Sequence, residues 1–313
     1  MLRKASSVNT FPTSFRSSTL PTTGARALVL GGGGSTGNAW LIGVVAGLLD
    51  AGLDVTAADL MVGTSAGSTA AVQICGAQPS ALFADILTAE RRPRRPATTG
   101  RGPSAIGTTN DYLQRTNAII SAARDAHDMR RRMGAAASES DSAEPARRAQ
   151  WRSTVAVRLP GSDWPDRPVL ITAVDARTGD PVAFDRNSGV DVVDAVAASC
   201  SGGAAYRIAE RCYIDGGYRR GENADLASGY ERVLVLSPFG GRSRMPVEWG
   251  MNLAAQIDEL RADGSSVETV FPDSADDDLF GANAMNLALR PAAARAGHAL
   301  GVRIIERLRD FWA

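Results

Sequence analysis

Residues 60–76 of the chain are LMVGTSAGSTAAVQICG, a short apolar run followed by glycine, a serine turn and an alanine-rich segment. The apolar run at 60–62 predicts a buried strand, and residues 68–76 predict a helix. The same order occurs upstream, where the apolar run 27–30 precedes four glycines and a helical pattern over 40–49. Strand, helix, strand and helix within fifty residues predict an α/β fold, with a parallel sheet covered by helices.

The rest of the chain continues this alternation around one segment of different character. Residues 91–150 contain two arginine pairs, Arg91-Arg92 and Arg94-Arg95, and a polar helical stretch at 110–133, and we predict an insertion or lid there. Residues 1–25 are rich in serine and threonine and are predicted to be a disordered tail that precedes one domain at 26–313. Further strands are predicted at 154–159, 169–174, 183–185, 211–214 and 232–236, and further helices at 253–261 and 291–312.

Composition excludes several classes of function. The 34 basic and 34 acidic residues balance, so no field of one sign is available to recruit nucleic acid. Lys4 is the only lysine, which leaves no lysine in the folded body for a Schiff base or a Ser-Lys dyad. Cys75, Cys200 and Cys212 are too few and too scattered for a disulfide framework or a zinc site. No cofactor is expected, and a reducing, cytosolic compartment is the simplest interpretation.

No stretch of the sequence predicts a membrane-spanning helix. Residues 27–49 carry no charge, but glycines and polar residues interrupt them, and the apolar part at 39–49 is far shorter than the ~20 residues that a spanning helix needs. The N-terminal residues lack the apolar core of a secretory signal. A cytoplasmic protein, with possible peripheral contact to a membrane, is therefore expected.

Ser65 stands in the pattern Gly-x-Ser-x-Gly, framed by Gly63 and Gly67 between the predicted strand and helix. A nucleophilic serine needs a sharp turn that exposes its hydroxyl, and glycines two residues before and after it relieve the crowding of such a turn. The helix that follows directs its N-terminal N–H groups to the place where negative charge would develop. A plain structural turn is the alternative, and the flanking elements favour Ser65 as a candidate nucleophile.

The glycine-rich stretch 31–37, GGGGSTG, admits three interpretations. A nucleotide P-loop is excluded because Gly37 is followed by asparagine rather than by lysine and a hydroxyl residue. A dinucleotide fingerprint is matched by Gly32, Gly34 and Gly37, but the acid that should end the next strand is replaced by the serine turn. The third interpretation is an oxyanion hole formed by the N–H groups of Gly32, Gly33 and Gly34. It explains why the two loops fall in consecutive strand–helix units, at the same edge of a parallel sheet.

An activated serine needs a base, and the candidates are two histidines and one carboxylate. His127 lies in the arginine-rich segment and His298 lies within alanine-rich helical sequence. Asp215 follows a predicted strand and precedes Gly216 and Gly217, which let other backbone approach its carboxylate closely. An Asp-Gly-Gly sequence is also a common turn. The combination of this acid with the two glycine motifs favours Asp215.

Together, the glycine loop, the Gly-Thr-Ser-Ala-Gly turn and the distal Asp-Gly-Gly resemble the patatin-like phospholipases over about residues 28–227. The resemblance implies a three-layer α/β/α fold with a Ser65–Asp215 dyad and an oxyanion hole at Gly32, Gly33 and Gly34. It also implies metal-free hydrolysis of fatty-acyl esters in phospholipids, lysophospholipids or neutral lipids.

This chain departs from that family pattern at two places. Thr36 stands where many relatives have arginine or lysine, and residues 199–205, SCSGGAA, lack the proline that relatives tend to show there. Two alternative functions stay open at this point. One is an α/β-hydrolase with a Ser65-Asp-His298 triad, and the other is a lipid- or dinucleotide-binding protein without catalysis.

Overall fold

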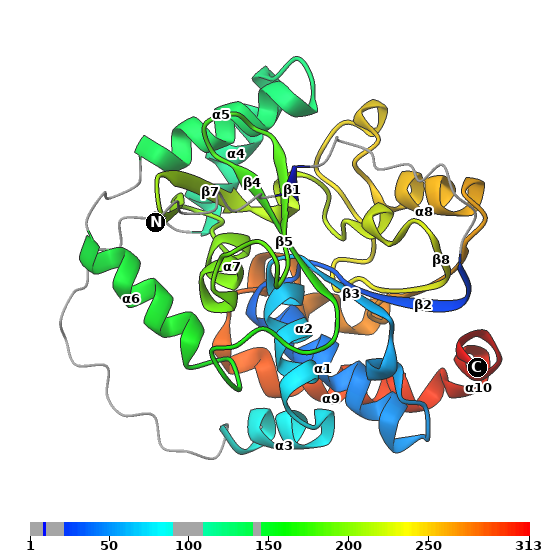
Figure 1. Cartoon of the computed structure of the whole chain (residues 1–313). Helices are drawn as coiled ribbons and strands as arrows, with labels where there is room; N and C mark the ends of the chain where they lie inside the picture. The colour runs from blue at the N-terminus through cyan, green and yellow to red at the C-terminus, as the bar shows by residue number, and fades with distance from the viewer. Residues whose placement is uncertain (1–8, 11–21, 90–108, 140–144) are drawn as a thin grey trace, which may run out of the picture.

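The structure, a computed structural model, describes residues 9–10, 22–89, 109–139 and 145–313, and Figure 1 shows their arrangement. The strands of these residues form one sheet: β1 (Asn9–Thr10), β2 (Thr22–Leu30), β3 (Leu60–Gly63), β4 (Val169–Asp175), β5 (Pro181–Phe184), β6 (Tyr206–Ile208), β7 (Arg211–Asp215), β8 (Tyr230–Leu236) and β9 (Ser266–Val270). Their α-helices are α1 (Gly34–Asp50), α2 (Ala66–Gly76), α3 (Pro79–Ala89), α4 (Thr109–Ala122), α5 (Ala126–Glu139), α6 (Pro145–Ala156), α7 (Val192–Ser199), α8 (Leu253–Ala262), α9 (Arg290–Arg303) and α10 (Ile305–Trp312).

The middle of the sheet is parallel and one side of it is antiparallel. Strands β4, β3, β2, β8 and β9 lie side by side in that order, and each neighbouring pair is parallel. Strands β5 and β1 extend the sheet beyond β4, and β7 and β6 also join it through β4, all by antiparallel pairing. The predicted α/β fold is therefore confirmed, with its antiparallel strands gathered around β4.

Helices cover both faces of the sheet, as a three-layer fold requires. Leu28 and Leu30 of β2 pack in the core that includes α1, α2 and α9, whereas Ala27 and Val29 pack with α8 and the short 3-10 helix Ala224–Ala227. This alternation follows from the two-residue period of a strand. In Figure 1, α1, α2 and α9 lie below the sheet and α8 lies above it.

Helix α1 is buried because α9 packs against it at glycines. A Cβ on Gly43 would stand 2.1 Å from the carbonyl oxygen of Ala294, and one on Gly47 would stand 2.2 Å from that of His298. Such separations leave no room for a side chain, so the two helix backbones approach closely. The helix that carries the glycine loop at its N-terminus is thereby held in place along its length.

Strands β3 and β7 meet end to end along one edge of β4. Strand β3 pairs with the first half of β4, where Gly63 is opposite Ile171. Strand β7 pairs with the second half of β4 in the reverse direction, where Asp215 is opposite Ala173. Because the two strands approach each other, the turn after Gly63 and the end of β7 come together. The central sheet thus joins two motifs that are far apart in the sequence.

The predicted strand at 154–159 is wrong, because α6 continues through Ala156. Val155, Val157 and Leu159 alternate in the sequence as the side chains on one face of a strand would. In the structure Val155 is buried and Val157 is 87% exposed. Trp151, one helical turn before Val155, donates a hydrogen bond from Nε1 to a carbonyl oxygen of α7. Helical spacing therefore decides which side chains are buried here.

The segment 91–150, predicted as an insertion or lid, contributes partly to the core. Its predicted helix at 110–133 is two helices, α4 and α5, and Met129 and Met133 of α5 are buried against Ile214 of β7. The arginine pairs at 91–95 lie outside the described residues. Likewise, the predicted helix at 291–312 is divided into α9 and α10.

The predicted disordered tail at 1–25 differs from the structure in two places. Residues 9–10 form β1 and pair with β5, and β2 already begins at Thr22. Pairing at a sheet edge uses backbone groups, so polar side chains do not prevent it. Residues 1–8 and 11–21 lie outside the described residues. None of the described helices is long and apolar enough to cross a bilayer.

Candidate active site

Ser65 occupies a strained turn between β3 and α2. Its backbone angles are φ 51° and ψ −115°, in a region that non-glycine residues rarely adopt. A Cβ on Gly63 would stand 2.6 Å from Cα of Ser68, and one on Gly67 would stand 1.9 Å from the carbonyl oxygen of Leu30. Both framing glycines are therefore required by the close approach of backbone, as the pattern Gly-x-Ser-x-Gly predicted.

Asp215 lies within hydrogen-bond distance of Ser65. The Ser65 hydroxyl donates to Oδ2 of Asp215 over 2.7 Å, and the N–H of Gly217 donates to Oδ1 over 2.8 Å. A Cβ on Gly216 would stand 2.2 Å from Oγ1 of Thr172, so this glycine allows the turn to pack on β4. Burial raises the pKa of Asp215 to about 6, while the hydrogen bonds from Gly217 and Ser65 act to lower it. Asp215 therefore has the contact and the proton affinity that a base for Ser65 needs.

The glycine loop lies beside Ser65, but its N–H groups are not equivalent. A Cβ on Gly32 would stand 3.8 Å from Cβ of Ser65, so the loop and the serine turn are neighbours. The N–H of Gly32 donates to the carbonyl oxygen of Gly221 over 3.0 Å. The N–H groups of Gly33 and Gly34 have no hydrogen-bond partner among the residues that the structure describes. Of the three predicted oxyanion donors, Gly33 and Gly34 are the ones left available.

The loop whose Gly221 accepts the hydrogen bond from Gly32 also supports the serine turn, through the buried side chain of Asn223. Asn223 has a left-handed φ of 56°, and its Nδ2 group lies 3.0 Å from Oγ1 of Thr64 and 3.2 Å from the carbonyl oxygen of Gly216. Nη1 of Arg219 donates to Oδ1 of Asn223 over 2.7 Å, which sets the orientation of the amide. Asn223 therefore bridges the turn of Ser65 and the turn of Asp215.

The end of α7 closes the other side of the serine turn. The backbone N–H of Ser65 donates to Oγ of Ser199 over 2.9 Å, and Sγ of Cys200 lies 3.1 Å from the Ser65 carbonyl oxygen. Burial raises the pKa of Cys200 to about 11, so its thiol stays protonated at neutral pH. The stretch 199–205, which lacks the family's proline, thus contacts the candidate nucleophile directly.

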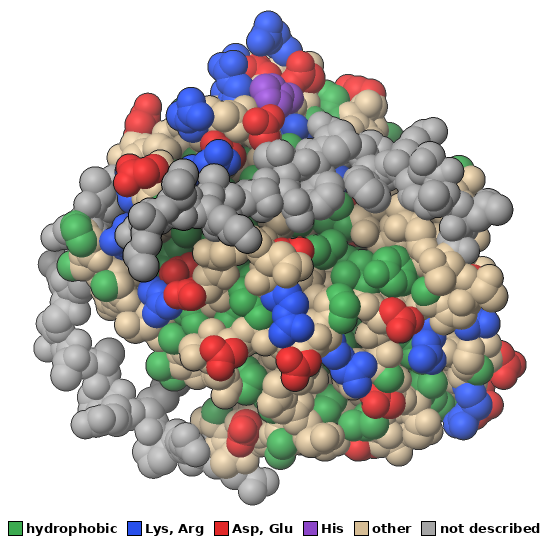
Figure 2. Space-filling view, viewed as in Figure 1, with side chains coloured by type: hydrophobic (Ala, Val, Ile, Leu, Met, Phe, Trp, Pro, Cys, Tyr) green, Lys and Arg blue, Asp and Glu red, His purple; other side chains and the backbone are tan. Residues whose placement is uncertain are grey.

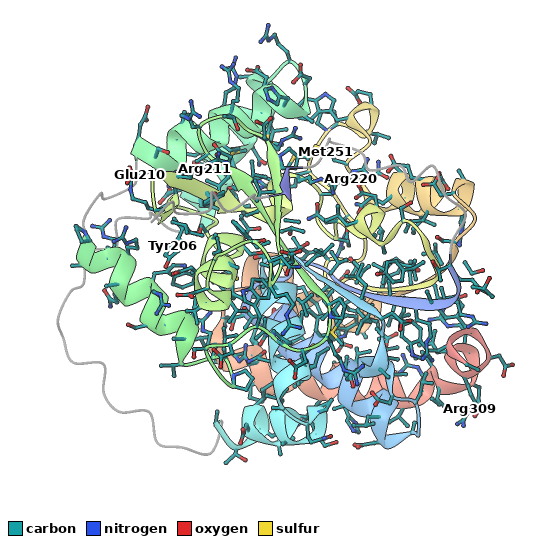
Figure 3. All side chains as sticks on the ribbon, viewed as in Figure 1. Tyr206, Glu210, Arg211, Arg220, Met251 and Arg309 are labelled. Atoms are coloured by element: carbon teal, nitrogen blue, oxygen red, sulfur yellow. The ribbon has the colours of Figure 1, made fainter. Side chains whose placement is uncertain are left out.

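A cavity of about 1750 Å³ opens at Ser65 and Asp215. Its volume exceeds the usual range for small-molecule sites, about 300–1,000 Å³, and suits a long apolar ligand. Arg220 and Met251, labelled in Figure 3, line it on the side nearer α8, and Tyr206 lines it near α7. Apolar side chains on its wall include Ile42, Leu82, Ile86, Leu113, Trp151, Phe239 and Phe280.

Both histidines lie away from this cavity. Nε2 of His298 is 2.9 Å from Oδ2 of Asp50, and its ring stacks on Phe83. Asp50 ends α1, about 24 Å along the helix from the glycine loop at 1.5 Å per residue. His127 is half-exposed, 3.7 Å from Asp180. The structure therefore brings neither histidine to Ser65, and the Ser65-Asp-His298 arrangement is absent from the described residues.

Comparison with known proteins shows which family the sequence matches. Residues 28–228 match the family model described as patatin-like phospholipase. Among solved structures, the chain is similar to the type III effector protein ExoU, with 15% identity over 92% of this chain and 54% of that chain at a TM-score of 0.38. It is also similar to VipD from Legionella pneumophila, with 11% identity over 98% of this chain and 72% of that chain at a TM-score of 0.38. The chain thus spans about half the length of ExoU. No curated protein matches it.

Proposed function

The chain belongs to the patatin-like phospholipase family, and from this premise we propose that it hydrolyses acyl esters of lipids with Ser65 as nucleophile and Asp215 as base. The 2.7 Å hydrogen bond from Ser65 to Asp215 carries the proposal, since both residues line a large, mainly apolar cavity. Among the described residues, no cluster of histidine, cysteine or acidic side chains has the arrangement of a metal site. The hydroxyl of Ser65 and the carboxylate of Asp215 are side chains suited to nucleophilic catalysis.

The reaction follows from the positions of these groups. Asp215 accepts the Ser65 proton as Oγ attacks the ester carbonyl carbon, and the carbonyl oxygen becomes an oxyanion. The N–H groups of Gly33 and Gly34 donate to that oxyanion. Collapse of the intermediate breaks the bond to the alcohol, which leaves with the proton from Asp215. Water, deprotonated by Asp215, then attacks the acyl-serine, and the fatty acid departs as the proton returns to Ser65.

Covalent labelling tests this proposal directly. A fluorophosphonate ester reacts with an activated serine and should modify Ser65, as located by mass spectrometry of the digested protein. A non-catalytic lipid- or dinucleotide-binding protein would leave the probe unreacted. Absence of labelling in folded protein would therefore remove the hydrolase proposal.

We expect the hydrolysis of a soluble ester to fall below about pH 6. Asp215 can accept the Ser65 proton only when it is ionised, and burial raises its pKa to about 6. Activity should therefore rise with pH through that value and level off above it, with about a tenfold loss for each pH unit below. The measurement is kcat/KM for a p-nitrophenyl ester between pH 4.5 and 8.5.

A histidine base would titrate in a similar range, so the control removes both histidines. The double variant His127→Ala, His298→Ala should keep the same acidic limb and an activity within a few-fold of wild type. Loss of activity by several orders of magnitude in that variant, while folded, would return the triad hypothesis.

We also propose that the mouth of the cavity contacts a lipid surface. Three of the large apolar side chains that are most exposed in the described residues, Val157 (87%), Met285 (68%) and Leu287 (65%), line this mouth. Figure 2 shows basic and acidic side chains interspersed on the face in view. The 34 basic and 34 acidic residues of the chain also balance, so the proposal depends on apolar contact rather than on a field of one sign. Exposed apolar residues gathered at one site indicate an interaction surface.

Changing Val157, Met285 and Leu287 together to serine should weaken binding to phospholipid vesicles by about tenfold or more, since each buried side chain stabilises the contact by about 1 kcal/mol or more. Vesicle flotation measures this binding. The matched control is Val247→Ser, because Val247 is 76% exposed and does not line the cavity. Equal vesicle binding by wild type and the triple variant would contradict the proposal.

A further inference from the structure

Arg290, the first residue of α9, extends its guanidinium toward the start of α1. Nη1 donates to the carbonyl oxygen of Ser35 over 2.7 Å, and Nη2 donates to Oδ1 of Asn38 over 3.1 Å. These acceptors are neutral, and no carboxylate within the described residues forms an ion pair with Arg290. Burial and the neighbouring charge of Arg158 lower the pKa of Arg290 to about 10, so the side chain is still a cation at neutral pH. A partly buried cation without a counter-ion is costly to keep.

Arg158 supplies a second cation on the same wall of the cavity. Its guanidinium lies over the ring of Trp151, with Cζ 5.6 Å from the ring centroid. Two buried amides connect Arg290 to the backbone of Arg158. Asn38 donates to Oε1 of Gln73 over 2.9 Å, and Gln73 donates to the carbonyl oxygen of Arg158 over 2.8 Å. Both arginines line the cavity that contains Ser65. The network therefore holds the backbone of Arg158, and the guanidinium of this exposed residue adds a second positive charge to the wall.

This network stands next to the candidate nucleophile. Nδ2 of Asn38 also lies 3.5 Å from the carbonyl oxygen of Ala66, the residue after Ser65. Ser35, which Arg290 contacts, directly follows the glycine loop. An anion bound by the two arginines would thus lie on the Ser65 side of the cavity, beside an ester held at the serine.

We propose that Arg290 and Arg158 bind the phosphate diester of a phospholipid headgroup, so that the cavity selects phospholipids over neutral acylglycerols. The inference rests on the proposed hydrolase function and adds its substrate class. A phosphate diester would supply the counter-ion that neither guanidinium has within the described part of the chain, and the planar fork of arginine matches phosphate oxygens. The apolar wall of the cavity accommodates the acyl chain of the same molecule.

Two substrates that differ only in the phosphate-bearing headgroup test this selection. Oleoyl-lysophosphatidylcholine and monooleoylglycerol are compared in the same detergent micelles, as the ratio of their kcat/KM values. We expect wild type to prefer the phospholipid, and Arg290→Gln to lower the ratio by about 10- to 100-fold, mainly through KM for the phospholipid. Arg290→Lys, which keeps the charge, should restore part of the ratio.

The matched control is Arg303→Gln on the same helix, because Arg303 is exposed and paired with Asp273. Its ratio should equal that of wild type. Arg158 is exposed, so Arg158→Gln should fold and lower the ratio even if Arg290→Gln is unstable.

Several outcomes would overturn the assignment. One such outcome is a wild-type protein that hydrolyses both substrates with equal kcat/KM. Another is an equal loss of kcat/KM for both substrates in Arg290→Gln and Arg158→Gln. Either result would mean that the network only supports the structure of α1. Calorimetric binding of inorganic phosphate that depends on Arg290, with an unchanged substrate ratio, would assign the site to a free anion. If wild type hydrolyses neither substrate nor any soluble ester, the proposed hydrolase function itself fails. Hydrolysis of a soluble ester without preference for the phospholipid would contradict only the headgroup selection.

Discussion

Replacing Ser65 with alanine is expected to reduce ester hydrolysis by about 10⁴-fold or more, because the change removes the hydroxyl that contacts Asp215. Oγ of Ser65 is the atom that donates to Asp215 over 2.7 Å. Cys200, which also borders the site, does not replace it, since burial raises its pKa to about 11 and keeps the thiol protonated. Removal of the nucleophile in serine hydrolases has effects of this size. The measurement is kcat/KM for a p-nitrophenyl ester.

The backbone at Ser65 provides a control for folding. Alanine must keep the φ of 51° that serine has, whereas glycine adopts it without strain. Relief of strain worth about 1–3 kcal/mol offsets the greater flexibility of glycine in the unfolded chain. Ser65→Gly should therefore unfold at a temperature no lower than Ser65→Ala, and both should be inactive. A variant of either kind that kept most of its activity would remove Ser65 from the mechanism.

The two strand–turn–helix units could be predicted from the sequence because their determinants are local. The apolar runs at 27–30 and 60–62 end in glycine and are followed by helical patterns, and β2, α1, β3 and α2 occupy these places. The crowding around Gly63 comes from the backbone of the same turn, whereas the crowding around Gly67 comes from Leu30 at the end of β2 and is not local. Residues close in the chain therefore specified both loops of the candidate site.

The approach of Asp215 to Ser65 could not be predicted from periodicity. It depends on β7 pairing with β4 in the reverse direction, and an apolar run does not state the partner or the direction of a strand. The sequence connected the two residues only through the combination of their motifs and the resemblance to a family. Two further contacts could not be predicted because they form between distant loops. The N–H of Gly32 donates to the carbonyl oxygen of Gly221, and Asn223 bridges the turns of Ser65 and Asp215.

Residues 154–159 show the limit of pattern alone. Their alternating valines match a strand period over six residues, yet packing of α6 against α7 decides that Val155 is buried and Val157 is exposed. A short alternating run at a helix end satisfies both periods, and the tertiary contact selects between them.

Replacing Asp215 with asparagine is expected to lower kcat/KM by about 10²–10⁴-fold, the usual contribution of general-base assistance. The amide has nearly the same shape as the carboxylate, and its oxygen can still accept the hydrogen bond from the N–H of Gly217. It cannot accept the Ser65 proton at neutral pH. The remaining activity should also lose the acidic limb near pH 6, which wild type measured in parallel retains.

The same Asp215→Asn variant is expected to be more stable than wild type at pH 8. Burial raises the pKa of Asp215 from its ordinary 3.8 to about 6, so the folded state disfavours the ionised form. Asp215 therefore contributes to the stability of the folded state below pH 3.8, where its carboxyl is protonated, and this contribution is lost as the pH rises through about 6. The difference between the pKa of 3.8 and the raised pKa of about 6 corresponds to a loss of at most about 3 kcal/mol in the free energy of unfolding. The carboxylate is partly exposed to the cavity, which makes this figure an upper bound. Urea unfolding should therefore give the variant a higher free energy of unfolding at pH 8, and the difference should shrink toward pH 4. If the variant lost both activity and stability at pH 8, Asp215 would have a structural role in the turn. Removal of a buried carboxylate that serves catalysis should instead raise the free energy of unfolding.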